Sequence, residues 1–148
     1  MAFRYSLQTV LRLRRSLERQ EEQRLFAAAS VVARLRVEIE QLEQDHFAQQ
    51  AQTYQELAAG SFGATFEFLA ACEAAFKQAR QALRLKLEQA EKERMKQLQR
   101  YKEARQKREI LEGLRDRQEA AYDLEFSRHE QQRTDEAHLL RLFVDPAD

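Results

Sequence analysis

Four consecutive residues near the C-terminus read Asp135, Glu136, Ala137 and His138. This Asp-Glu-Ala-His tetrapeptide is the one by which a large class of nucleic-acid-stimulated ATPases is named. In such enzymes the acidic pair works from the end of a buried, β-rich strand, beside a loop that holds the nucleotide phosphates. The tetrapeptide therefore raises the question of whether this chain hydrolyses ATP.

The rest of the sequence argues against ATP hydrolysis. A phosphate-binding loop of the type G-x-x-x-x-G-K-[ST] needs glycines at fixed spacing, so that backbone N–H groups and a lysine can hold the nucleotide. Glycine occurs only at positions 60, 63 and 113, and none of them begins that pattern. The segment from Glu130 to Arg141 shows no strand-like alternation. We expect the tetrapeptide to be a chance match in an acidic helix.

Metal binding and nucleophilic catalysis are equally weakly supported. Glu125 with His129 and Asp135 with His138 are spaced to share a helical face, but such pairs are common on charged helices, and the chain has no H-E-x-x-H motif or cysteine cluster. Cys72 is the only cysteine and has no basic neighbour within one helical turn. We expect no catalytic residue, no metal site and no cofactor, in a protein that is not an enzyme.

The composition is that of long helices. The chain has 148 residues, with three glycines, one proline and no tryptophan, and 34% of its residues are charged. Alanine, leucine, glutamine, glutamate, lysine and arginine dominate, as in coiled coils. No run of β-branched and aromatic residues alternates with polar ones as a strand would. We therefore expect an all-α fold that buries apolar side chains along a seam between helices.

The helix-breaking residues of the interior cluster between Ala59 and Thr65, where Gly60 is predicted to end the first helix. On both sides of this cluster, apolar residues recur at alternating spacings of three and four, which is the heptad pattern of a coiled coil. Before the turn they are Leu25, Ala28, Val32, Leu35, Ile39 and Leu42; after it they are Phe66, Leu69, Phe76, Leu83 and Leu87, with Glu73 and Arg80 at the intervening seam positions.

The seam is less regular elsewhere. Beyond Leu87 it is predicted to pass through Met95, Leu98, Ile110 or Leu111, Leu114 and Ala121. Polar residues are expected in it as well, where they weaken the packing but favour one register over its slips: Arg14, His46, Gln49, Arg80 and Arg94.

The pattern predicts one antiparallel coiled-coil hairpin over residues 1–148, with the second helix longer than the first. The helices are expected at about 3–58 and about 65–141, with a turn at about 59–64 and a short tail at 142–148. Folding about residue 61 or 62 places residue 3 opposite roughly residue 121. About twenty residues of the second helix, including the tetrapeptide, then extend past the N-terminus.

The charges are balanced overall but unevenly distributed. The formal charge is +3 over residues 1–24, +1 over 25–35, −6 over 36–76, +7 over 77–117 and −5 over 118–148, and it sums to zero. If the chain folds near residue 61, segments of opposite charge face each other and help to fix the antiparallel register. A nucleic-acid-binding stripe is the alternative interpretation, but a chain of zero net charge has no global field to attract a polyanion.

The sequence favours a soluble cytoplasmic protein. No stretch approaches the ~20 apolar residues of a membrane-spanning helix. The first twenty residues contain no uninterrupted apolar region of the kind a signal peptide needs. A lone cysteine cannot form an internal disulfide.

Two regions carry more apolar surface than a two-helix seam requires. In the N-terminal region, Phe3, Leu7, Val10, Leu11, Leu13 and Leu17 spread around more than one face, with arginines between them. In the second region, Phe68, Cys72, Ala75 and Ala79 form a stripe beside the seam. Each of these two apolar regions suits the binding of a protein partner. The alternatives are an amphipathic membrane helix at the N-terminus and, for the second stripe, alanines that merely tolerate exposure.

Three segments carry a resemblance to a known family. They are FRYSLQTVLRLR at Phe3–Arg14, FLxxxE at Phe68–Glu73 and LRDRQEAAYxxExxRxEQxxxDE at Leu114–Glu136. In their order and spacing they resemble FliJ, a family of small cytoplasmic proteins of the bacterial flagellar type III export apparatus. The resemblance covers nearly the whole chain, including its length and hairpin layout.

The resemblance implies a stalk similar to the central shaft of rotary ATPases. FliJ proteins insert the open end of the hairpin into the hexameric export ATPase FliI and promote its assembly and activity. They also bind the export gate protein FlhA and escort export chaperones. The implied location is the cytoplasmic face of the inner membrane, reached through these partners, with no nucleic acid involved.

The resemblance also implies contact residues. Those for the export ATPase lie at the open end: Leu7, Leu11, Arg14, Leu17, Arg117, Tyr122, Glu130, Asp135 and Glu136. Those for the export gate are Leu42, Phe68, Cys72, Ala75 and Ala79. The chain departs from the family pattern at the gate surface. Cys72 and Ala79 stand where a larger apolar residue and a histidine can occur, and Asp45 and Gln49 replace aromatic residues.

Other functions stay open from the residues alone. A generic coiled-coil adapter, or the homologous stalk of a virulence type III secretion system, would share the hairpin and its apolar stripes. The arginine-rich N-terminal segment would also suit a nucleic-acid or membrane binder.

Overall fold

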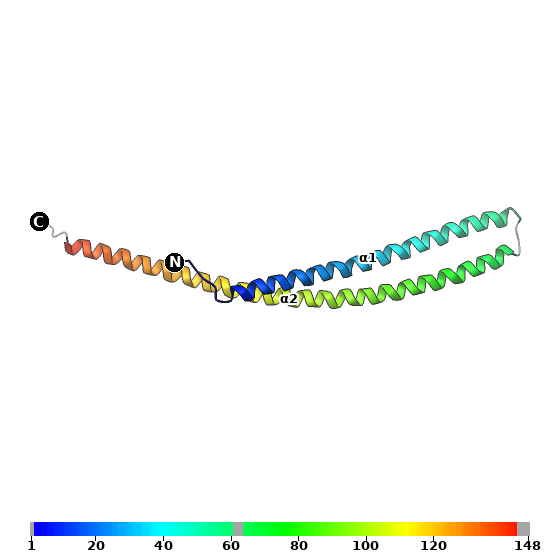
Figure 1. Cartoon of the computed structure of the whole chain (residues 1–148). Coiled ribbons are helices and arrows are strands. Elements are labelled where there is room, and N and C mark those ends of the chain that lie inside the picture. The colour runs from blue at the N-terminus through cyan, green and yellow to red at the C-terminus, as the bar shows by residue number, and fades with distance from the viewer. Residues whose placement is uncertain (1, 61–63, 145–148) are drawn as a thin grey trace. The chain divides into compact units, whose positions relative to one another are not determined.

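The computed structural model describes residues 2–60 and 64–144, and two α-helices account for nearly all of them (Figure 1). Helix α1 spans Gln8–Ala58 and helix α2 spans Ala64–Val144, with 51 and 81 residues. The two helices pack against each other in antiparallel directions, and no strand occurs in the described residues. The predicted all-α hairpin with a longer second helix is confirmed.

The helix bounds differ from the prediction at both ends of the chain. Helix α1 begins at Gln8 instead of near residue 3, and the preceding segment contacts α2 through Phe3 and Tyr5. Tyr5 is buried there, and its hydroxyl donates a hydrogen bond of 3.0 Å to the backbone carbonyl of Leu111. Helix α2 continues to Val144, past the predicted end at residue 141. The remainder of the predicted tail lies outside the described residues.

Helix α1 ends as the glycine pattern predicts. Its last residue is Ala58, and the amide of Ala59 donates to the carbonyl of Gln55 at 3.1 Å. Gly60 has φ +100°, the left-handed conformation that residues with a Cβ rarely adopt. Residues 61–63 of the predicted turn lie outside the described part of the chain.

The chain divides into two units, each containing part of both helices. The central unit is Arg19–Lys102, and the terminal unit combines Met1–Glu18 with Glu103–Asp148. The candidate surfaces considered below lie within one unit or the other.

In the central unit the predicted seam is largely confirmed. All six predicted apolar positions of α1 are buried or half-buried, as are Leu69, Glu73, Phe76, Arg80, Leu83 and Leu87 of α2. Phe66 is 61% exposed, so its predicted seam position is wrong. Gln49 is exposed while Gln50 is half-buried, so the register of α1 shifts by one residue after His46.

Beyond Leu87 the seam positions of α2 keep the heptad spacing, even where polar residues occupy them. Met95 is 61% exposed, and the predicted position there is wrong, because the alternation of three and four continues through Ala90, Arg94 and Gln97. Gln97 is 8% exposed, and its amide nitrogen donates both to the backbone carbonyl of Glu21, at 3.3 Å, and to the carboxylate of the same residue. A polar side chain occupies the seam because its hydrogen bonds are satisfied across it.

In the terminal unit the seam centres on Leu11, which is fully buried. Leu111 is half-buried and Ile110 is exposed, which decides between the two predicted positions. Ala121, which was predicted to lie in the seam, is exposed, and its neighbour Tyr122 is half-buried. The predicted seam position is therefore wrong by one residue. The rings of Phe3 and Tyr122 lie 5.7 Å apart, which confirms the predicted pairing of residue 3 with a residue near 121.

Opposite charges do pair across the terminal unit, though as individual residues and not as blocks. Arg108 binds both carboxylate oxygens of Glu18, at 2.6 and 3.1 Å, and donates to Glu112 at 2.6 Å. Arg15 donates to the other oxygen of Glu112 at 3.0 Å. The hydrogen bond from Arg108 is the main reason that the pKa of Glu112 lies below its ordinary value, and burial opposes this shift. These charge-assisted bonds join α1 to α2 in one register.

Gly113 offers a direct test of helix stability. A methyl group at this position would meet no atom within 4 Å, and the glycine lies inside α2, where alanine is favoured by about 1 kcal/mol. We expect Gly113→Ala to raise the free energy of unfolding by about that amount, measured by urea denaturation followed by circular dichroism. Gly60→Ala is the matched control and should destabilise the chain, because of the positive φ at Gly60. Equal effects of the two changes would contradict this account.

The charge cluster predicts a pH-dependent stability. Because the pKa of Glu112 is lowered in the folded state, its contribution is complete above its ordinary pKa of 4.5 and is lost as the pH falls through the lowered value. Glu112→Gln should therefore cost roughly 1 kcal/mol of unfolding free energy at neutral pH and little in more acidic solution. Denaturation at several pH values measures the difference. The control, Glu88→Gln, removes an exposed pair with Lys92 within one helix, away from the cluster, and should change much less. A cost independent of pH would contradict the assignment.

Candidate functional site

The tetrapeptide that suggested catalysis lies on α2. Asp135, Glu136, Ala137 and His138 are helical and exposed, as expected for an acidic helix and unlike the end of a buried strand. In the described residues no group of three or more histidine, cysteine or acidic side chains is placed to hold a metal ion. Neither described helix is long and apolar enough to cross a membrane. The surfaces that remain as candidates suit binding to other proteins.

Four of the five predicted gate residues come together in the central unit. Leu42, Cys72, Ala75 and Ala79 line one groove of about 280 Å³, formed where α1 and α2 lie side by side. The fifth, Phe68, is 54% exposed and does not line this groove. The convergence follows from the antiparallel register, because Leu42 belongs to α1 and the other three residues recur at helical spacing on one face of α2.

A stacked pair of rings lies beside these residues. His46 from α1 stacks on Phe76 from α2, with centroids 3.8 Å apart and planes within 3° of parallel. The guanidinium carbon of Arg80 lies 5.0 Å from the centroid of the same Phe76 ring. His46 Nε2 also lies 2.9 Å from a carboxylate oxygen of Glu73. The sequence prediction treated His46 and Arg80 as register-fixing polar residues and missed that both contact Phe76.

The α1 side of the groove is polar. Gln49 donates a hydrogen bond to Cys72 Sγ at 3.4 Å, and Asp45 accepts one from Gln41 at 2.9 Å. Asp45, Gln49, Cys72 and Ala79, which were expected from the sequence to depart from the pattern of the resemblance, all line this groove. This groove can receive an apolar side chain from a partner, with hydrogen-bonding groups at its α1 edge.

The residues predicted to contact the export ATPase belong to the terminal unit but differ in exposure. Arg117, Glu130, Asp135 and Glu136 are exposed, and Arg14, Leu17 and Tyr122 are half-buried. Leu7 is just over one-third exposed. Leu11 is fully buried between the helices, so its side chain supports the packing of this unit and has no free surface for a partner.

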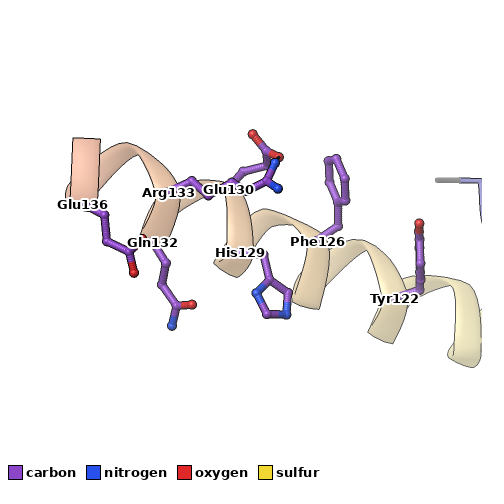
Figure 2. A pocket seen from close by; sticks show the side chains of 7 residues that line it. All are labelled: Tyr122, Phe126, His129, Glu130, Gln132, Arg133 and Glu136. Atoms are coloured by element: carbon purple, nitrogen blue, oxygen red, sulfur yellow. Dashed lines mark ion pairs between the residues drawn. The ribbon is translucent and has the colours of Figure 1, made fainter. Parts of the chain in front are cut away.

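A shallow hollow of about 500 Å³ follows one face of α2 past the N-terminal segment. It is lined by Tyr122, Phe126, His129, Glu130, Gln132, Arg133 and Glu136 (Figure 2). In this view Tyr122 and Phe126 point to one side of the helix, and His129, Gln132 and Glu136 point to the other. As contact residues, the sequence prediction named Tyr122, Glu130 and Glu136 of this set, and it considered His129 only as a metal ligand. Helical spacing from Tyr122 would have found Phe126 as well.

An aromatic ladder leads onto this face. The Phe3 ring lies 5.7 Å from that of Tyr122, which lies 6.4 Å from that of Phe126. The N-terminal segment thus covers the beginning of the face, and Phe126 is left half exposed beyond it. The remaining lining residues carry acceptors and donors of both charges. The chemistry of this surface is that of a protein contact with an apolar start and a charged continuation.

Comparison with known proteins relates the chain to a family. No curated protein and no solved structure matches the chain. Residues 3–146 match the family model described as FliJ, Flagellar FliJ protein. This match spans nearly all of the 148 residues and includes both candidate surfaces. The chain therefore belongs to the FliJ family of flagellar export proteins.

Proposed function

We propose that the chain is the stalk of the hexameric flagellar export ATPase FliI and promotes its assembly and activity without hydrolysing ATP itself. Membership of the FliJ family relates the chain to flagellar export. The observation that carries the finer proposal is the part of α2 beyond the N-terminal segment. From position 123 to position 144 every residue is exposed, so this helix is available to enter a ring of subunits.

The surface proposed for the ATPase combines charged and apolar groups of the terminal unit. Glu130, Asp135 and Glu136 supply exposed carboxylates, and Arg117 supplies an exposed cation. Tyr122 and Leu7 add partly exposed apolar area near the start of this helix. Charged groups at the rim of such a contact mainly affect the rate of encounter and the register of binding.

The groove of the central unit is proposed as the surface for the export gate protein FlhA. Ala75 and Ala79 are exposed on its α2 side, and Leu42 and Cys72 are half-buried beside them. Export chaperones are proposed as further partners. Through these partners the protein would act at the cytoplasmic face of the inner membrane.

The ATPase proposal predicts stimulation without intrinsic activity. Adding an equimolar amount of this chain should raise ATP hydrolysis by its cognate export ATPase several-fold, whereas the chain alone should release no phosphate. Glu130→Lys with Glu136→Lys should reduce the stimulation, because two exposed carboxylates of the proposed contact are reversed. Glu88→Lys reverses an equally exposed carboxylate of the central unit and serves as the control. Absence of stimulation by the unaltered chain would refute the stalk function.

The gate proposal predicts a local steric effect. Ala75→Arg should weaken binding to the cytoplasmic part of the gate protein by about tenfold, because a long charged side chain would fill the groove. Ala74→Arg places the same side chain on a neighbouring exposed position that does not line the groove, and it should bind normally. Titration calorimetry measures both affinities. Equal affinities for the two variants would exclude the groove as the contact.

A further inference from the structure

The face of α2 that packs in the terminal unit continues past the residues that cover it. Leu111, Arg115, Glu119 and Tyr122 are half-buried and follow one another at spacings of four, four and three. From Tyr122 onward, alternating spacings of four and three continue through Phe126, His129, Arg133, Glu136, Leu140 and Phe143. This is the heptad pattern of a coiled-coil seam, and these six residues are called the bare seam below.

The bare seam is exposed although both of its ends are apolar. Phe143 is 82% exposed and Leu140 is 63% exposed, and every other residue from 123 to 144 is exposed as well. Leu140 and Phe143 line a second hollow, next to the one that contains Phe126. A solitary helix that shows large apolar side chains at heptad spacing lacks the second helix that would cover them.

We propose that the bare seam binds the bare seam of a second copy of this chain, with the two helices antiparallel. The proposal rests on the continuity of this face with the packed seam of the terminal unit and on the complementarity of its own side chains. It does not depend on the function proposed above.

One antiparallel register matches every seam position. In it, Phe126 lies opposite Phe143 of the second copy, His129 opposite Leu140, and Arg133 opposite Glu136. Because the arrangement is two-fold symmetric, each pairing occurs twice, with the ion pairs in the middle and the aromatic pairs at both ends. The Arg133 guanidinium and the Glu136 carboxylate are both exposed in the single chain. Arg133 lies 3.7 Å from the Glu130 carboxylate of its own helix, and such an exposed pair is weak enough to be exchanged for Glu136 of the other copy.

Neighbouring registers are less favourable. A shift by one heptad in one direction sets Phe126 against Glu136 and His129 against Arg133. The opposite shift sets Arg133 against Phe143 and Glu136 against Leu140. The flanking positions also suit the matched register, since Glu130 faces Ala137 and Gln132 faces Leu139. No like charges then face each other, which is a requirement for a specific antiparallel pair.

The proposed dimer covers part of the surface that we assign to the ATPase, because Tyr122, Glu130 and Glu136 border or belong to the bare seam. A dimer of this kind and entry of the same helix into a ring exclude each other. Self-association would thus keep the apolar end of α2 covered until the ring is present.

Sedimentation equilibrium of the full chain alone tests the proposal. We expect a monomer–dimer equilibrium with a Kd in the roughly micromolar range. Arg133→Glu and Glu136→Arg should each weaken it by about tenfold or more, because each sets like charges against one another twice in the dimer. The double variant, with both changes, restores opposite charges and should return the Kd to near its original value. Arg128→Glu alters a charge on the outer face of the same helix and is the matched control.

A monomeric chain at all concentrations would overturn the proposal. A dimer unaffected by Arg133→Glu, or one that also survives Phe126→Ser with Leu140→Ser, would place the contact elsewhere and overturn it as well. Failure of the double variant to recover would overturn the antiparallel register. All substituted residues are exposed in the single chain, so circular dichroism should show unchanged helix content. The experiment contains no ATPase, so its outcome is separate from that of the stimulation assay.

Discussion

The seam between the two helices contains few large apolar side chains. Burial of apolar surface alone therefore does not fix how the helices are aligned. Among the described residues, Leu11 and Val32 are the large side chains that are almost completely buried, and Tyr5 and Leu35 complete the buried apolar set. Two packed helices can bury only one stripe each, so most seam residues keep part of their surface in water. The hydrophobic effect brings such helices together, but because it is non-directional, it does little to distinguish one register from the next.

Contacts of polar residues between the helices distinguish the observed register from its neighbours. Within the central unit, His46 stacks on Phe76 and Gln97 donates to Glu21. Within the terminal unit, Arg108 binds both oxygens of the Glu18 carboxylate. Each contact joins one position of α1 to one position of α2, and a slip along the seam would leave partly buried polar groups without partners. The polar seam residues therefore lower the packing quality and raise the specificity of the antiparallel arrangement.

The sequence was informative where local spacing decides the structure. Gly60 ends α1 and the heptad positions near Val32 and Phe76 face inward, because both features follow from backbone geometry and periodicity. Hydrophobicity misled the prediction at Met95, whose neighbour Gln97 occupies the seam through hydrogen bonds to a residue 76 positions away. The same reasoning brought Leu42 and Ala75 to one groove through the register. It did not reveal that Leu11 is fully buried, because the apolar residues near the N-terminus spread around more than one face and do not single out one seam position.

Helical geometry also explains why the Asp-Glu-Ala-His tetrapeptide does not act as one chemical unit. Successive residues of an α-helix point about 100° apart, so Asp135 and Glu136 occupy different faces of α2. Glu136 lines the hollow together with Phe126 and Arg133, and Asp135 does not. An acidic box concentrates its groups on one site, whereas this helix distributes them around its circumference. Residues that are adjacent in the sequence thus belong to separate surfaces. The helical conformation, and not the order of the four residues, determines which groups can act together.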